Sequence, residues 1–382
     1  MVRNLLRIAV VVGVLLAAFV AWFFANYGGT GQPFPRIGDP KPRLKAELIA
    51  TLPEPPGNIA VSATGRVFFT YHAEGHPAIK VLELVNGRPV PYPNLEMQRG
   101  DRSKPSYGAV FNIRIDSRNR LWSIDHGEHG LFGARLVAVD LGTNKPIKQI
   151  WLPRSVAGIG SYVQDMQIDA AGRMIYIADI GVFSGHPGLI VLDSETGKAR
   201  RVLDRHPAIM PGPYAVRAQG RLMQPLGSSL FWFHPGFDPI AVDRQGTWLY
   251  IGPMSGRMLS RVRVADLNNE SLSPSELAAR VEPYAERPQA DGLTIDNEGS
   301  IYLTGIEDGI VWKLGPDRKL TALAGHPRMR WPDGLSFGPN NMIYVADSDI
   351  PDVMMQSKAH MREKAPYYLF RFPADGTAPA GQ

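Results

Sequence analysis

The chain has 382 residues, of which 44% are hydrophobic and 20% are charged, so it can bury the core of one large domain. Its net charge of +5 comes from scattered basic residues rather than from a basic stripe, and we therefore expect no nucleic-acid partner. Cysteine is absent, which excludes disulfide bonds, thiolate metal sites and a cysteine nucleophile.

Residues 1–27 contain an uncharged apolar run that is long enough to cross a bilayer core of about 30 Å. Arg3 and Arg7 precede the run and favour a cytoplasmic N-terminus, and aromatic residues at its far end suit the opposite membrane interface. The segment therefore predicts a transmembrane anchor that places the rest of the chain in the periplasm or at the cell exterior. The alternative is a cleaved signal peptide and a secreted protein. A cleavage site after Ala25 would require a small residue two positions earlier, where this sequence has Phe23.

After a proline- and glycine-containing linker at residues 28–45, one pattern occurs six times: an Asn or Asp, an apolar strand, a tight turn and a second strand. In residues 290–303, ADGLTIDNEGSIYL, apolar residues recur at period two on both sides of the turn, which is typical of a β-hairpin. Six such hairpins predict an all-β fold, a six-bladed β-propeller over residues 46–373. Residues 374–382 are expected to form a disordered tail.

The first residue of every repeat is polar. The inner strands of a propeller all start at one mouth of the channel, so these residues should form a ring there. The six are Asn58, Asn112, Asp165, Asp238, Asp291 and Asp333. Three further aspartates close the second strand of their hairpins and should return to the same mouth, namely Asp125, Asp179 and Asp347.

Residues 44–52 are expected to form a strand that closes the ring of blades by completing the last one. Four elaborations are expected at the mouth that carries the ring: residues 126–129 after Asp125, the proline-rich, aromatic residues 200–236, a helix over about residues 273–285 capped by Ser273 and Glu276, and the Met-rich residues 348–366. Loops held over a rigid scaffold are where binding residues concentrate, so this mouth is the predicted site.

Four aspartates that face one channel would repel one another, so some should take up protons or share a cation. Oxygen ligands suit a hard ion, with Ca²⁺ the first choice and Mg²⁺ or Mn²⁺ as alternatives. Such an ion can polarise a carbonyl or acidify water, and Asp165, Asp291, Asp333, His126 or His129 could then transfer a proton. The alternative is that each acidic residue only ties down a turn through backbone N–H groups. The sequence contains no nucleophile-elbow, zincin or Walker motif.

A group of motifs spread over residues 48–372 is specific as a set: PGNIAVSATGRVFF, LWSIDHG, QDMQIDAAGRMIYIAD, LYIGPMSGRMLSRVRVADL, QADGLTIDNEGSIYL and WPDGLSFGPNNMIYVAD. These motifs resemble the bacterial branch of the major royal jelly protein/yellow family, whose members are often labelled dopachrome-tautomerase-related or gluconolactonase-like. The resemblance implies a six-bladed propeller, in agreement with the repeats. It implies less about function, because the family includes pigment-pathway members and secreted non-enzymatic members.

The related gluconolactonase and regucalcin propellers bind a divalent ion through a Glu in blade one, an Asn in blade four and an Asp in blade five. By blade position, the resemblance carries these ligands onto Asn58, Asp238 and Asp291. Asp291 keeps the family's residue type. The blade-one glutamate is replaced by asparagine, and the blade-four asparagine is replaced by aspartate, so all three positions keep an oxygen ligand.

The sequence thus predicts a membrane-anchored propeller that acts on a small cyclic or carbonyl substrate, by lactone hydrolysis or tautomerisation. Asn58, Asp238 and Asp291 would hold the ion, with Asp165 or Asp333 as the base. The alternative is a non-catalytic propeller of the cell envelope that captures a ligand or protein with the aromatic residues 214–234. A purely architectural role is the third hypothesis.

Overall fold

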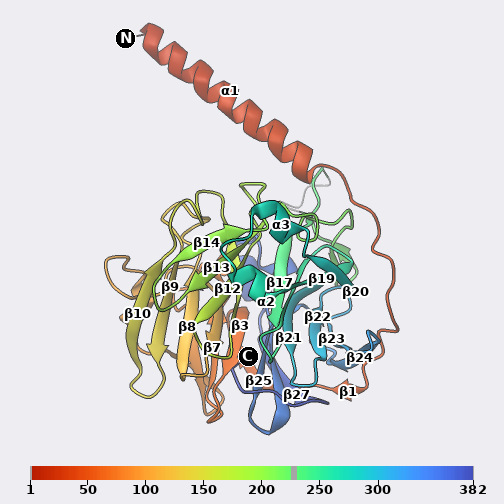
Figure 1. Cartoon of the computed structure of the whole chain (residues 1–382). Coiled ribbons are helices and arrows are strands. Elements are labelled where there is room, and N and C mark those ends of the chain that lie inside the picture. The colour runs from red at the N-terminus through yellow and green to blue at the C-terminus, as the bar shows by residue number, and fades with distance from the viewer. Residues whose placement is uncertain (1, 225–229, 382) are drawn as a thin grey trace.

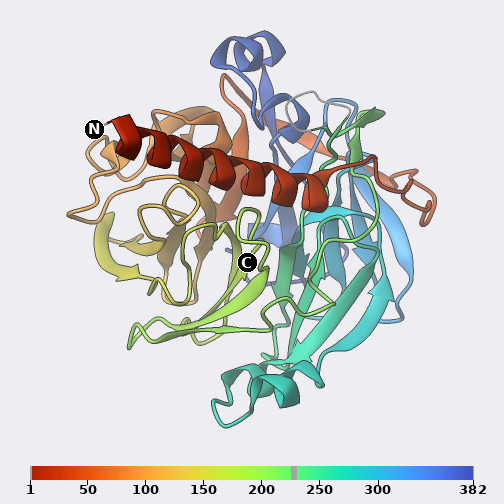
Figure 2. The same ribbon diagram turned by 90° about the horizontal axis from the view of Figure 1, so that it is seen from above.

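Six antiparallel sheets surround a central channel in the computed structural model, which describes residues 2–224 and 230–381 (Figure 2). Each predicted repeat forms the two inner strands of one sheet, and the inner strands of neighbouring sheets contact one another around the channel. The chain is therefore a six-bladed β-propeller preceded by a long apolar helix, as the sequence predicts.

Within a blade, the strands follow one another in sequence from the channel to the perimeter. Blades one to three contain β3 (Pro56–Val61), β4 (Val67–Tyr71), β5 (Val81–Val85) and β6 (Arg88–Pro91); β7 (Val110–Ile115), β8 (Arg120–Asp125), β9 (Arg135–Asp140) and β10 (Lys145–Trp151); and β11 (Val163–Ile168), β12 (Met174–Asp179), β13 (Gly188–Asp193) and β14 (Ala199–Val202). Blades four to six contain β17 (Phe237–Val242), β18 (Trp248–Pro253), β19 (Met258–Arg263) and β20 (Glu282–Glu286); β21 (Ala290–Ile295), β22 (Ile301–Gly305), β23 (Ile310–Leu314) and β24 (Leu320–Gly325); and β25 (Pro332–Gly338), β26 (Met342–Asp347) and β27 (Tyr367–Pro373). Outside the blades lie α1 (Val2–Tyr27), the hairpin of β15 (Arg217–Ala218) and β16 (Arg221–Leu222), α2 (Val264–Asn268), α3 (Pro274–Ala278) and α4 (Lys358–Lys364).

The ring of blades is closed by the start of the propeller sequence. β2 (Glu47–Leu52) pairs antiparallel with β27 and becomes the outer strand of blade six, as predicted. The two residues of β1 (Leu44–Lys45) instead pair in parallel with β24 of blade five, so the predicted strand is divided between two blades. The first and last blades are thereby joined without a gap.

The closing aspartates hold the inner hairpins at the mouth. Asp179 accepts hydrogen bonds from the backbone N–H groups of Tyr162 (2.7 Å) and Gly181 (2.9 Å), and Asp347 accepts them from Arg330 (2.8 Å) and Trp331 (2.7 Å). The bonds from Tyr162, Arg330 and Trp331 tie the loop that enters a blade to the end of that blade's second strand, and the bond from Gly181 holds the turn that follows β12. At Asp179 and Asp347 the carboxylate therefore stabilises a loop by accepting hydrogen bonds from backbone N–H groups, which is the alternative role given above for acidic residues.

The capped helix lies elsewhere than predicted. Its capping box is present, because Ser273 Oγ accepts from Glu276 N (3.3 Å) and Glu276 Oε2 accepts from Ser273 N (2.8 Å). However, the helix ends at Ala278 and leads into β20, so it connects the two outer strands of blade four at the perimeter and not at the mouth (Figure 2). The error arose because the charged, proline-containing β20 lacks the alternating pattern of the inner strands.

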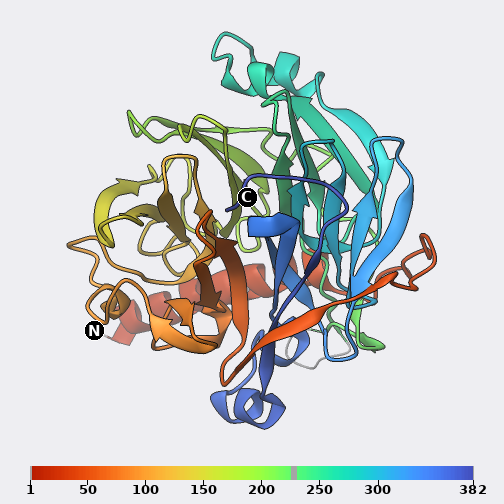
Figure 3. The same cartoon turned by 90° about the horizontal axis from the view of Figure 1, so that it is seen from below.

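The C-terminal residues also differ from the predicted disordered tail. They cross the channel at the end opposite the ring (Figure 3). There, Gly381 N donates to Phe337 O (2.9 Å) and Gly381 O accepts from Ile115 N (3.2 Å), which links blades six and two. Thr377 N donates to a carboxylate oxygen of Glu298 (3.0 Å) in blade five. These bonds cover the lower end of the channel.

α1 is almost entirely exposed and rises obliquely from the mouth of the propeller, with the N-terminus pointing away from the blades (Figure 1). An 18-residue window within residues 3–27 has a mean hydropathy of 2.7, and the helix is long and apolar enough to cross a membrane. A signal sequence has the same properties.

The closing strand provides a test of the fold. Leu52 is 1% exposed in the core between blades six and one, so Leu52→Ala should cost about 2–5 kcal/mol of unfolding free energy and lower the thermal midpoint by several degrees. Leu95→Ala removes the same atoms from a side chain that is 64% exposed and should change stability by no more than about 0.5 kcal/mol. Equal midpoints for the two variants would show that β2 is dispensable for closure.

Candidate functional site

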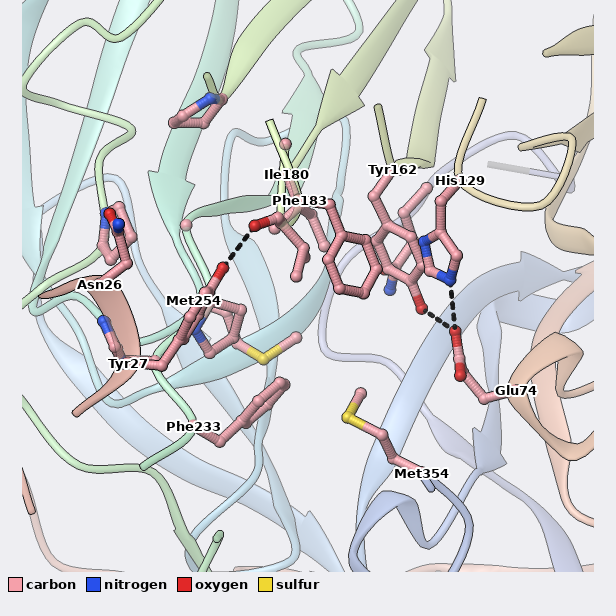
Figure 4. A pocket seen from close by; sticks show the side chains of 18 of the residues that line it. Asn26, Tyr27, Glu74, His129, Tyr162, Ile180, Phe183, Phe233, Met254 and Met354 are labelled. Carbon is pink, nitrogen blue, oxygen red and sulfur yellow. Dashed lines mark hydrogen bonds and ion pairs between the residues drawn. The ribbon is translucent and has the colours of Figure 1, made fainter. Parts of the chain in front are cut away.

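A cavity of about 340 Å³ lies at the mouth, between the channel and the last turn of α1. On the channel side it is lined by Asp291, Gln164 and Trp331, and on the outer side by Phe23 and Tyr27 of α1. Figure 4 shows that most of the wall is apolar, with methionine and phenylalanine side chains pointing into the space. The mouth therefore carries a recess that is wide enough for a small molecule.

One wall of the cavity carries polar groups from three blades. Glu74 comes from the turn after β4, His129 from the loop after β8 and Tyr162 from the loop before β11. Tyr162 Oη donates to Glu74 Oε1 (2.8 Å), and His129 Nε2 lies 3.9 Å from the same oxygen (Figure 4). The rings of His129 and Tyr162 stack with centroids 4.8 Å apart.

The two predicted histidines differ in position. His129 lines the cavity, whereas His126 lies behind it, with its ring against Phe111 (4.8 Å between centroids) and Tyr162 (5.3 Å). Nδ1 of His126 accepts from His129 N (2.9 Å), and burial lowers the pKa of His126 well below its ordinary value. His126 is therefore a neutral packing group that orients the loop of His129. Burial also lowers the pKa of His72, on the cavity wall, to about 3.

The structure places all six ring residues at the mouth ends of the inner strands, and all six are buried. Asn112 Nδ2 donates to Asp165 Oδ1 (2.7 Å), and Gln164 Nε2 donates to Asp238 Oδ2 (3.2 Å). Of the ring, Asp291 lines the cavity. The predicted ring is thus an assembled polar layer rather than six separate turn residues.

A cation of the chain itself lies beneath this layer. Arg114, two residues after Asn112 on β7, is 1% exposed, and its guanidinium donates to Leu335 O (3.1 Å) and to Asn58 Oδ1 (3.4 Å). Burial lowers the pKa of Arg114, and the charges of Asp165 and Asp333 oppose that change. Arg114 therefore supplies part of the charge compensation that the sequence analysis assigned to a bound ion.

Two aspartates of the ring form a carboxyl–carboxyl pair. Asp291 Oδ2 accepts from Trp331 Nε1 (2.5 Å), and a hydrogen bond joins Asp291 to Asp238. Asp238 Oδ1 is buried and receives no N–H or O–H donor from residues 2–224 or 230–381. A proton on Asp238 satisfies this geometry, because it lets Asp238 donate to Asp291.

The pKa values of the ring follow from burial. Burial raises the pKa of Asp291 to about 6, against the hydrogen bonds from Trp331 and Asp238, which lower it. Burial, followed by the charges of Asp291 and Asp165, raises the pKa of Asp238 and of Asp333 well above the ordinary value. Burial raises the pKa of Asp165 to about 7, with Arg114 opposing. The hydrogen bond between the two carboxyl groups raises the pKa of Asp238 and lowers that of Asp291, so the pair holds its proton on Asp238 when Asp291 ionises.

The three positions predicted to hold a metal ion do not form a matching ligand set. Asp238 and Asp291 are hydrogen-bonded to one another, and Asn58 Oδ1 already accepts from Ile59 N (2.9 Å) and from the Arg114 guanidinium (3.4 Å). A cation bound to Asn58 would lie beside a fixed positive charge. Over the described parts of the chain, no three His, Cys, Asp or Glu side chains are grouped as metal ligands. We derive no chemistry through a metal here.

The sequence analysis missed Glu74, Tyr162, Trp331 and Arg114. Glu74 follows the second strand of blade one, as His129 follows the second strand of blade two. The equivalent place of the two residues in their blades could therefore have indicated that Glu74 lies at the mouth. Tyr162 and Trp331 directly precede inner strands at the same mouth. Arg114 was visible as a charge within an apolar inner strand.

Comparison with known proteins fits this architecture. The sequence profile of the family described as "Major royal jelly protein" matches residues 108–355, which is more than half of the chain. The chain belongs to the major royal jelly protein family. This membership confirms the resemblance found in the motifs.

Two family members of Apis mellifera align with parts of the chain. Major royal jelly protein 3 is 31% identical over 100 residues, which cover 23% of this chain and 18% of that protein. Major royal jelly protein 9 is 21% identical over 240 residues, which cover 59% of this chain and 53% of that protein. The chain thus spans about half or less of the length of these relatives.

Solved structures with the same fold include a calcium-binding protein, regucalcin, from Agrobacterium tumefaciens, with a TM-score of 0.56 and 13% identity over 89% of this chain and 98% of that one. A gluconolactonase from Xanthomonas campestris has a TM-score of 0.55 and 12% identity over 91% of this chain and 96% of that one. At these identities the likeness concerns the fold alone, so this member of the major royal jelly protein family must be interpreted from its own residues.

The raised pKa of Asp165 predicts a pH-dependent stability. The folded state keeps a proton on Asp165 up to about pH 7, whereas the unfolded chain loses it near the ordinary value of 3.8. This group's stabilisation is therefore complete below pH ~4 and is lost as the pH rises through ~7. Asp165→Asn keeps an acceptor for Asn112 without the titration, so relative to wild type it should gain a few kcal/mol, on the order of 1–4, between pH 4 and 8.

Thermal midpoints of both proteins across this pH range measure the difference. Titrating groups outside the ring are common to the two proteins and cancel in the comparison, whereas loss of the Asp165 charge also lowers the pKa values of Asp238 and Asp333. Parallel curves for wild type and Asp165→Asn would contradict a raised pKa at this position.

Proposed function

We propose that the protein is an enzyme that uses the Asp238–Asp291 pair for proton transfer on a small cyclic ester or carbonyl compound bound in the mouth cavity. The observation that carries the proposal is an ionisable carboxylate, Asp291, held at the channel end of an apolar cavity of about 340 Å³. Buried carboxyl pairs with raised and divergent pKa values are typical of acid–base sites.

The chemistry follows from the protonation states. Ionised Asp291 accepts a proton, either from water that attacks a lactone carbonyl or from a carbon next to a carbonyl group. Before the transfer, protonated Asp238 stabilises the Asp291 carboxylate by donating a hydrogen bond to it. After the transfer, the proton of Asp238 is available to Asp291. Trp331 Nε1 fixes the orientation of Asp291, which keeps the reacting oxygen directed to the cavity. Lactone hydrolysis and tautomerisation both use this arrangement.

The substrate is expected to be uncharged and largely apolar. The cavity wall consists mainly of aromatic, aliphatic and methionine side chains. Its polar side chains are Asn26, His72, Glu74, His129, Gln164, His234 and Asp291. An anionic substrate would lose its hydration in this recess without a matching countercharge, because no Lys or Arg among the residues that the structure describes lines the cavity. The competing hypothesis of ligand capture by the aromatic insertion is less favoured, because Trp232 and Phe231 of that insertion pack against the end of α1.

We also propose that α1 is retained as a membrane anchor and that the propeller faces the periplasm or cell exterior. Three bonds join the end of α1 to the propeller: Tyr27 Oη to Val182 O (2.6 Å), Trp232 N to Tyr27 O (3.0 Å) and Trp232 Nε1 to Gly28 O (3.2 Å). Signal cleavage near Ala25 would remove Phe23 from the cavity wall. The retained segment therefore contributes to the site itself.

Replacement of the proposed base tests the enzyme proposal. Asp291→Asn keeps the shape and the hydrogen bond from Trp331 but cannot accept the proton, so turnover of the best substrate in a lactone and ketone panel should fall roughly 100-fold or more. In the wild type, kcat/KM should rise with pH through about 6, where Asp291 ionises.

Glu270→Gln is the matched control, because Glu270 pairs with Lys198 (2.6 Å) at the perimeter. It should retain full activity. An Asp291→Asn enzyme that keeps more than about a tenth of wild-type turnover would exclude Asp291 as the base.

The anchor proposal predicts the form of the protein in its native cell. The chain should stay in the membrane fraction after an alkaline carbonate wash, and intact-mass analysis should include residues 1–27. A soluble form that begins after residue 25 would contradict retention and leave the cavity without part of its wall.

A further inference from the structure

The mouth of the propeller carries exposed apolar side chains on several loops. These residues, here called the apolar rim, are Leu131, Phe132, Ile159, Phe183 and Met355. They lie in the loops after β8, β10, β12 and β26, which all return to the mouth that holds the ring. Contiguous exposed apolar surface of this kind marks a contact with another apolar phase or partner.

The rim is held in place by the fold. Gly160 N donates to His129 O (2.9 Å), which joins the loop of Ile159 to the loop of Leu131. The Arg154 guanidinium donates to Gly130 O (3.2 Å) and Leu131 O (3.0 Å), so it fixes the backbone that presents Leu131 and Phe132. Large apolar groups are therefore presented outward by an ordered backbone.

α1 leaves the propeller beside this rim. The Trp22 indole packs against Gly185, two residues from Phe183, and Tyr27 Oη bonds to Val182 O. The apolar run of α1 ends at Ala25, two residues before Tyr27. Because a helix rises about 1.5 Å per residue, this end of the run lies within about 5 Å of Tyr27 along the helix axis. A bilayer entered by α1 thus lies directly over the apolar rim.

The rim is also continuous with the cavity. Phe183, which points into the cavity in Figure 4, and Met355 belong to the rim and line the cavity, and Phe23 of α1 also lines it. An apolar molecule that leaves the bilayer beside α1 therefore passes from lipid to the cavity wall without crossing bulk water. Such a path favours molecules that already partition into the membrane.

We propose that the apolar rim rests in the surface of the membrane that α1 enters and that the cavity takes its substrate from that membrane. The substrate class is an amphiphile with a cyclic ester or ketone group and an alkyl or isoprenoid-like apolar part. The inference rests on the proposed anchoring by α1 and deepens the proposed function. The reacting group reaches Asp291, and the apolar part lies along the wall toward α1.

The absence of cysteine allows single labels to test the position of the rim. The full-length protein is reconstituted in phosphatidylcholine vesicles with an environment-sensitive fluorophore on Ile159→Cys, where the native side chain is 72% exposed. Ser117→Cys is the matched control, because Ser117 is exposed in the turn between β7 and β8 at the opposite end of the propeller. Lipids with a nitroxide on the acyl chain should quench the label at 159 several-fold more than the label at 117.

Equal quenching at the two positions would overturn the membrane-resting surface. A label at 159 that is shielded both from lipid quencher and from iodide in the water would show a protein partner or a second copy on the rim, and would also overturn it. Neither measurement depends on turnover, so the result is independent of the proposed reaction.

A second experiment tests the route into the cavity. A long-chain alcohol that carries a diazirine, dissolved in the vesicle membrane, should label the peptides that contain Met254 or Phe233 on light activation, in wild type and Asp291→Asn alike. Labelling confined to α1 and the rim would overturn the route.

Lactones that share one ring and differ in alkyl chain complete the test. In vesicles, kcat/KM should rise at least tenfold from the short to the long chain. Equal values for both would overturn the amphiphile class and leave the proposed reaction intact, whereas loss of turnover for every lactone with normal labelling would overturn the reaction alone.

Discussion

The architecture of the mouth depends on how four buried aspartates are compensated in one narrow channel. Unpaired carboxylates in such a place are strongly destabilising, and the structure reduces the cost by two means. Arg114 enters the channel from blade two and faces Asp165 and Asp333. The second means is proton sharing, because the hydrogen bond between Asp238 and Asp291 raises the pKa of Asp238 and favours its protonated form. The acid pair is thus a consequence of packing six inner strands that each begin with a polar residue.

This compensation connects the fold to the chemistry. Propeller closure by β2 fixes the inner strands, and the closing aspartates tie down their loops. The loop before β25 then brings Trp331 to the acid pair, and strand β11 brings Gln164. The outer part of the site comes from α1, whose last turn covers the cavity. The last turn of α1 is therefore a structural part of the pocket. The proposed anchoring of α1 in a membrane accounts for the apolar residues exposed around it.

Much of the fold could be predicted from the sequence, because β-hairpins are local. Period-two alternation and turn residues identify every inner strand, and topology then places Asp165, Asp238 and the other ring residues at one mouth. Contacts between blades are not local and were not predicted. Tyr162 and Glu74 are 88 residues apart, and Trp232 meets Gly28 across 204 residues. The metal ligand set was transferred by position and could not anticipate that Arg114 would engage Asn58.

The most direct test of this account is whether Asp238 carries a proton at neutral pH. Infrared difference spectroscopy of the full-length protein, wild type minus Asp238→Asn, detects the C=O stretch of a protonated carboxyl group, with Asp308→Asn as a control at a separate position. The account predicts a protonated-carboxyl band at pH 7 that is lost in Asp238→Asn and is unchanged by a chelator or by added Ca²⁺. The absence of this band in the wild type, or its disappearance when Ca²⁺ is added, would mean that both aspartates are ionised around a cation, which would contradict the proton-sharing pair.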